Sequence, residues 1–134
     1  VSIDRQCAEW ALDTAVRDAP LTPGGQLSIT LEWQALADMD ADYTIFVQVL
    51  NANDRIVGQA DVWPLQGTYP TSQWQPGETI TDPIAIQLDG DLPPGDYRLI
   101  LGWYLLADLR RLPVLDSSGS PTADRFVVSG LEVR

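Results

Sequence analysis

Apolar and polar residues alternate along much of this sequence, and the alternation predicts β-strands. From Gln26 to Trp33 every second residue is apolar, as in a strand with one buried face. The same period recurs at 79–88 and at 96–106, and the run at 43–50 is rich in the β-branched and aromatic residues typical of a central strand. We therefore expect long strands at these four places.

Weaker patterns predict further strands at 8–16, 55–63, 111–115 and 126–133. The first of these is also compatible with a helical turn, but its period of two favours a strand. Pro83 predicts an edge strand or a bulge, because proline cannot donate a hydrogen bond to a neighbouring strand. Gly130 lies where the alternation of the last strand loses phase, which predicts a bulge.

Short strands separated by glycine- and proline-containing turns, with no long helix, are typical of an antiparallel sandwich. We predict an all-β fold with about eight strands, spaced roughly 8–12 residues apart, that form a single antiparallel β-sandwich of Ig-like or jelly-roll type. Trp33 and Trp103 lie on the apolar faces of their predicted strands, so we expect both in the core.

Two details of the segment at 96–106 refine this prediction. Ile100, Tyr104 and Leu106 lie on the side opposite its main apolar face, which predicts that this second face is partly covered as well. Tyr97 follows a Pro-Pro-Gly turn and opens the strand. We expect its hydroxyl to bond back to the preceding loop, as in the tyrosine corner of Greek-key sandwiches.

The length of 134 residues is typical of one domain, and we assign residues 1–134 to a single domain. No apolar run approaches the roughly 18 residues that a membrane span needs, so we expect no direct membrane insertion. The sequence begins at Val1 and its only methionine is Met39. We therefore expect this chain to be a piece of a longer protein.

The composition excludes several kinds of chemistry. The sequence contains no histidine, and all eight basic residues are arginines, which removes Ser-His-Asp catalysis, His-ligated metals and Schiff-base lysines. The only cysteine, Cys7, has no intrachain disulfide partner and is expected to be an ordinary thiol. The net charge of −11 would repel phosphate backbones, so we predict no nucleic-acid partner.

Three alternating aspartates, Asp38, Asp40 and Asp42, suggest a calcium site, because Ca²⁺ prefers oxygen ligands. The alternative is a solvated acidic turn between two strands. The sequence lacks the glycine and glutamate of a helix-flanked calcium loop, so such a site would need further aspartates from another loop. No other cofactor is expected. No carboxylate pair suited to glycoside hydrolysis stands out, and we predict no catalytic residue.

Aromatic residues gather in the connection at 63–76, outside the alternating segments. Trp63, Tyr69 and Trp74 could stack on sugar rings, while Gln73 beside them offers hydrogen bonds. The alternative is a compact loop that folds back and buries its own rings over the sandwich edge. Exposed and coplanar rings would favour the carbohydrate site, and buried rings would remove it.

The sequence resembles a β-sandwich module that follows the membrane-spanning part of some bacterial polytopic glycosyltransferase-like proteins of mannosyltransferase type, notably in filamentous phototrophic bacteria and their relatives. The resemblance covers roughly residues 25–115 and is carried by four runs: LEWQAL at 31–36, DYTIFVQVL at 42–50, GTYPTSQWQPGE at 67–78 and LPPGDYRL at 92–99. The family often has histidine where this chain has Gln48.

This resemblance implies an extracytoplasmic location in the cell envelope and brings no catalytic residues with it. The function that we expect is therefore a non-catalytic accessory domain, a structural or interaction module. Its expected partner is a glycan or another envelope domain. The alternative function is a carbohydrate-binding module that uses the aromatic residues of the loop at 63–76.

Overall fold

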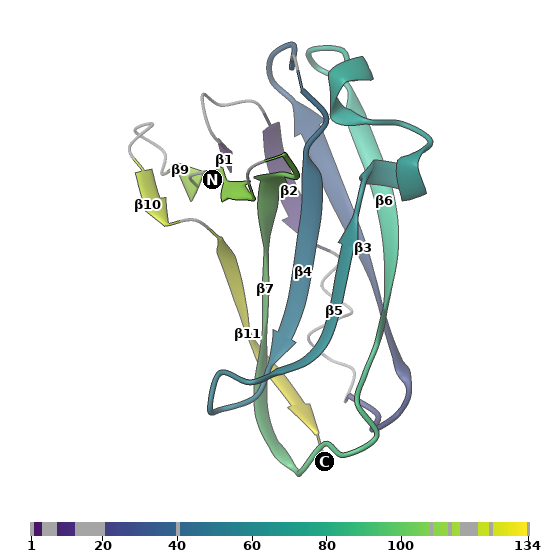
Figure 1. Ribbon diagram of the computed structural model, residues 1–134, viewed down its shortest axis with the longest axis vertical. Coiled ribbons are helices and arrows are strands. Elements are labelled where there is room, and N and C mark those ends of the chain that lie inside the picture. The colour runs from purple at the N-terminus through teal and green to yellow at the C-terminus, as the bar shows by residue number, and fades with distance from the viewer. Residues whose placement is uncertain are drawn as a thin grey trace.

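The structure is a computed structural model that describes residues 2–3, 8–12, 21–39, 41–107, 109–112, 114–115, 121–123 and 125–133. Its strands form two antiparallel sheets packed face to face (Figure 1), which confirms the predicted all-β sandwich. One sheet has the order β10-β9-β1-β2-β3-β6, and the other has the order β11-β7-β4-β5, with β8 paired to β7.

Six strands of seven residues or more build the body of the sandwich in the described ranges: β3 Gln26–Ala35, β4 Thr44–Leu50, β5 Ile56–Val62, β6 Thr79–Gln87, β7 Gly95–Leu105 and β11 Phe126–Val133. The shorter strands are β1 Ser2–Ile3, β2 Ala8–Leu12, β8 Arg110–Arg111, β9 Val114–Leu115 and β10 Pro121–Ala123. Two short 3₁₀ helices, η1 Pro64–Gly67 and η2 Thr71–Gln73, lie between β5 and β6.

One of the predicted strands needs correction and another is described only in part, and the described ranges hold eleven strands, six of them long, where about eight were expected. The segment at 111–115 is not one strand, because β8 pairs with β7 in one sheet and β9 pairs with β1 in the other. A run of five residues is too short for its alternation to reveal such a change of partner. The predicted strand at 8–16 is described only as far as Leu12, and the rest of it lies outside the described residues.

Two features of the strand pairing lie where the sequence predicted them. Pro83 belongs to β6, which is an edge strand of its sheet, so its missing N–H costs no central hydrogen bond. The register of β11 against β7 shifts between Val128 and Leu131, which confirms the bulge near Gly130.

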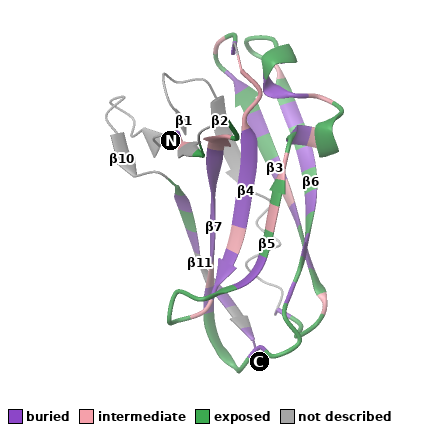
Figure 2. Cartoon of the chain, viewed as in Figure 1, coloured by how far each residue is buried: buried purple, intermediate pink, exposed green. Residues whose placement is uncertain are grey.

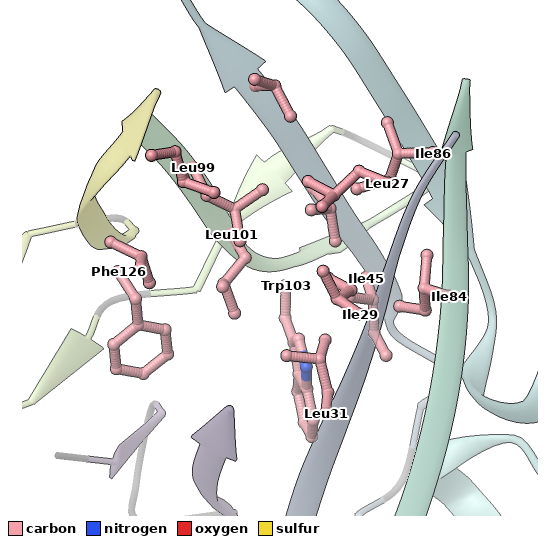
Figure 3. Close-up of a cluster of buried hydrophobic side chains, with 14 of the residues drawn as sticks. Leu27, Ile29, Leu31, Ile45, Ile84, Ile86, Leu99, Leu101, Trp103 and Phe126 are labelled. Atoms are coloured by element: carbon pink, nitrogen blue, oxygen red, sulfur yellow. The ribbon is translucent and has the colours of Figure 1, made fainter. Parts of the chain in front are cut away.

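The core lies between the two sheets and is built from the alternating apolar residues. In β3 and β6 every second residue is buried, and these side chains meet those of β4, β7 and β11 (Figure 3). The cluster includes Leu27, Ile29, Leu31, Ile45, Ile84, Ile86, Leu99, Leu101 and Phe126. Burial of apolar surface on this scale is the main stabilising contribution in a domain of this size.

Aromatic rings fill one part of this core. Trp33 and Trp103 are fully buried, as predicted, and their ring centroids lie 5.0 Å apart. Trp74 meets Trp103 edge to face at 5.6 Å, and Tyr43 stacks on Trp103 at 5.8 Å. Trp103 belongs to β7, and these contacts connect its sheet to β3 of the opposite sheet and to the loop that follows β5.

Tyr97 forms the predicted tyrosine corner at the start of β7. Its hydroxyl donates a hydrogen bond to the backbone carbonyl of Pro93 at 2.6 Å, and its ring is buried. The bond fixes the turn that carries the chain from one sheet to the other.

Replacing Tyr97 with phenylalanine is expected to lower the free energy of unfolding by about 1 kcal/mol, because it removes one partly buried hydrogen bond and leaves the ring in place. Urea unfolding followed by circular dichroism measures this change. We expect the slope of the unfolding free energy against urea concentration to be the same in both proteins. A variant as stable as the parent would contradict a stabilising role for this bond.

Candidate functional site

The outer faces of the two sheets differ in character, and this difference locates the candidate site. The outer face formed by β3 and β6 is mostly polar and exposed, with Thr30 half-buried: Gln26, Ser28, Thr30, Glu32, Gln34, Thr79, Thr81, Pro83, Ala85 and Gln87. In contrast, β4 and β7 are buried over most of their lengths (Figure 2). Their outward residues Phe46, Leu50 and Ile100 form a second buried cluster with Tyr104 packed against it.

A hollow of about 240 Å³ lies on this outer face, and we call it the β4–β7 hollow. It is lined by Phe46, Gln48, Asp61, Tyr104, Leu109 and Arg111. The strand register places Phe46 between Asp61 of β5 and Gly102 of β7. A glycine at that position leaves the outer face of β7 without a side chain beside the ring.

Arg111 covers the aromatic part of this hollow. Its guanidinium carbon lies 4.3 Å from the centre of the Phe46 ring, a cation–π arrangement. The pairing of β8 with β7 sets Arg111 opposite Tyr104, and the Tyr104 ring lies 6.2 Å from that of Phe46. Leu109 precedes β8 with a left-handed backbone, at φ 57°, and its side chain is 68% exposed at the rim.

The charges around the hollow balance. Asp61 contributes a carboxylate and Arg111 a guanidinium, while Gln48 contributes a neutral amide. Burial raises the pKa of the Tyr104 phenol, and the nearby Asp61 carboxylate raises it further. The phenol keeps its proton at neutral pH, and it is hydrogen-bonded to the Asp61 side chain. The hollow offers both donors and acceptors without a net charge.

The loop aromatics do not form the predicted three-ring platform. Trp74 is 1% exposed, and its indole N–H donates to the carbonyl of Tyr69 at 2.9 Å. It points into the core because Trp103 offers it an aromatic partner, so it cannot stack on a ligand. Trp63 is 39% exposed, Tyr69 is half-buried and Gln73 is exposed. The alternative prediction, a loop that folds back over the sandwich, fits the position of Trp74.

A buried carboxylate holds the same loop against the sheet. Asp82 lies on the core face of β6 and is 1% exposed, and its Oδ1 accepts a hydrogen bond from the Leu65 N–H at 3.2 Å. Burial raises the pKa of this carboxyl group. Leu65 and Gln66 in η1 have left-handed backbone angles, which non-glycine residues rarely adopt, so the contact holds a strained turn in place.

Glu78 fixes the other end of the loop. Its Oε1 accepts a hydrogen bond from the Tyr69 hydroxyl at 2.6 Å and one from the Gln75 N–H at 3.1 Å. The bond from Tyr69, and then that from Gln75, lower the pKa of the Glu78 carboxyl group.

Replacing Glu78 with glutamine is expected to destabilise the protein at neutral pH and to have little effect in acid. A carboxyl group whose pKa is lowered by folding adds stability above its ordinary value of 4.5, and this contribution is lost as the pH falls through the lowered value. Urea unfolding at several pH values measures the difference between parent and variant. Glu32→Gln, at an exposed position of β3, controls for the loss of a charge; a difference that persists in acid would contradict the expectation.

The predicted calcium residues are only partly described. Asp42 accepts a hydrogen bond from the Ser72 N–H at 3.1 Å, so it links the segment before β4 to η2. Asp38 is exposed, and Asp40 lies outside the described residues. Where the chain is described, no three carboxylate or thiol side chains are grouped to hold a metal ion. The calcium site stays a prediction.

Comparison of the sequence with protein-family models finds no match, and comparison with curated proteins finds none either. Within the described ranges, no helix has both the length and the apolar character needed to cross a membrane.

The hollow was not predicted from the sequence, although the residues on the second face of 96–106 had indicated that this face is partly covered.

Proposed function

We propose that this chain is a non-catalytic accessory domain of the cell envelope, an interaction module that makes contact through the outer face of the β11–β7–β4–β5 sheet. The observation that carries the proposal is the contrast between the two outer faces. An outward sheet face is usually polar, as it is on β3 and β6. The outward apolar residues of β4 and β7 are themselves buried, so the feature of this face that offers a contact is the open hollow beside them.

The strand order supports an Ig-like form of the sandwich. The strands β2, β3 and β6 face β5, β4, β7 and β11, the order in which Ig-like folds divide their strands between two sheets. The tyrosine corner lies at the start of β7, the last long strand but one, as it does in that fold. The envelope location rests on the resemblance of the sequence to extracytoplasmic modules.

The groups in the hollow also support binding rather than catalysis. The sequence contains no histidine or lysine, and Tyr104 holds its proton firmly. A general acid or base works best with a pKa near the working pH, which a phenol with a raised pKa does not have. A carbohydrate-binding module that uses the loop at 63–76 is the weaker proposal, because Trp74 is buried.

Co-sedimentation of the purified chain with cell-envelope fragments of a filamentous phototrophic bacterium, the group that the resemblance indicates, tests the proposed function. We expect the parent protein to sediment with the fragments and Arg111→Ala to lose most of this binding. Arg55→Ala is the matched control, because Arg55 precedes β5 and pairs at 3.5 Å with Asp89, which follows β6 of the other sheet, so it lies outside the hollow. A parent protein that stays in the supernatant, or two variants that behave alike, would overturn the proposal.

A further inference from the structure

The chemistry of the β4–β7 hollow indicates what kind of ligand it takes. We propose that it binds a neutral saccharide through one sugar ring, an inference that rests on the proposed function because it uses the same face. The hollow of about 240 Å³ is smaller than the about 300–1,000 Å³ of sites for drug-sized ligands. A single ring of a longer glycan suits an open hollow of this size.

The polar groups match the hydroxyl groups of a sugar. Asp61 only accepts hydrogen bonds and Arg111 only donates them, whereas the amide of Gln48 does both. The Tyr104 phenol, which is hydrogen-bonded to Asp61, adds a hydroxyl oxygen that can accept a further hydrogen bond. Neighbouring hydroxyl groups on a sugar ring each donate and accept, so they can satisfy donors and acceptors placed around one small hollow.

The arrangement is also held in place before any ligand arrives. The Arg111 guanidinium lies over the Phe46 ring, at 4.3 Å from its centre, and its backbone is paired to β7. A side chain that is already ordered loses less conformational entropy on binding. The exposed Leu109 side chain at the rim offers an apolar contact for the C–H face of a sugar ring.

Charge separates this ligand class from the others. Asp61 and the net charge of −11 disfavour an anion, and Arg111 disfavours a cation. An apolar peptide segment would place apolar side chains against the charged groups of Asp61 and Arg111, and covering charged groups in that way is costly. A neutral ligand rich in hydroxyl groups avoids each of these penalties.

Titration of the ¹⁵N-labelled chain with methyl glycosides of glucose, galactose, mannose and N-acetylglucosamine, followed by NMR, tests the inference. We expect saturable amide shifts around Phe46, Gln48 and Arg111 for at least one of these neutral sugars. Asp61→Asn and Arg111→Ala should each weaken the affinity about tenfold or more, as loss of a hydrogen bond to a charged group does. Arg55→Ala should leave the affinity unchanged, and spectra of the unbound variants report whether each still folds.

Several outcomes would overturn the saccharide inference. The first is that no neutral glycoside causes a saturable amide shift. The second is that the shifts are confined to residues outside the hollow. The third is that glucuronic acid or glucosamine binds more tightly than the neutral sugars. The two proposals fail separately. If Arg111→Ala abolishes sedimentation with envelope fragments but no glycoside binds, the hollow contacts another envelope component, and the interaction module stands without the sugar.

Discussion

Replacing Trp103 with alanine is expected to lower the free energy of unfolding by about 3–5 kcal/mol, the cost of truncating a large buried aromatic residue. Trp103 is 0% exposed, and its ring contacts Trp33 at 5.0 Å, Trp74 at 5.6 Å and Tyr43 at 5.8 Å. Its removal would leave a cavity that three rings from other elements cannot fill without moving. Urea unfolding of parent and variant, followed by circular dichroism, measures the change.

Trp63→Ala is the matched control for this substitution. Trp63 is the same residue type but is 39% exposed, and substitutions at exposed positions usually change stability by about 0.5 kcal/mol or less. We therefore expect the second variant to unfold close to the parent. If the two variants lose similar stability, or if Trp103→Ala loses less than about 1 kcal/mol, the aromatic cluster does not have the central role assigned to it here.

The long strands could be predicted because their burial follows a local rule. In β3 every second residue faces the core, so seven or eight residues of sequence contain the whole signal. Tyr97 is similar, because its hydroxyl bonds to a carbonyl only four residues away. Such features depend on neighbours in the chain, and the sequence shows those neighbours directly.

The candidate site could not be predicted in the same way, since its residues come together only through pairing between strands. Phe46 meets Asp61 because β4 pairs with β5 in one particular register, and Tyr104 meets Arg111 because β8 folds back on β7. A shift of one residue in either register would turn these side chains to the other face. The sequence predicted a strand at Arg111 but not its partner strand, and the hollow depends on that partner.

Trp74 and Asp82 are buried, and their roles also could not be predicted from neighbouring residues in the sequence. Aromatic residues in a proline-rich loop fit a surface platform as well as a buried anchor, and only the distant ring of Trp103 decides between them. Asp82 interrupts an otherwise apolar face of β6, and its buried carboxylate has a role only because η1 brings the Leu65 N–H to it. In both cases the deciding contact is made by a residue far away along the chain.

Replacing Gly58 with alanine is expected to lower the free energy of unfolding by about 1–3 kcal/mol, the usual cost of adding a group to a well-packed site. Gly58 lies where β5 approaches the end of β6: it bridges Leu88, and the Asp89 N–H donates to the Val57 carbonyl at 2.9 Å. A Cβ atom at Gly58 would lie 2.9 Å from the Leu88 side chain and 3.0 Å from the carbonyl oxygen of Gln87. Thermal and urea unfolding of the variant measure the loss.

The backbone oxygen is the part of this contact that makes the cost hard to avoid. The Leu88 side chain could rotate away, but the Gln87 carbonyl belongs to the backbone, and the adjacent Leu88 N–H donates to the Gly25 carbonyl at 2.9 Å. Gly90→Ala is the matched control, because a Cβ at that position meets no atom within 4 Å, and we expect it to unfold like the parent. If Gly58→Ala is equally stable, the two edges can separate at little cost, and contacts between β5 and β6 do not contribute to closing the sandwich.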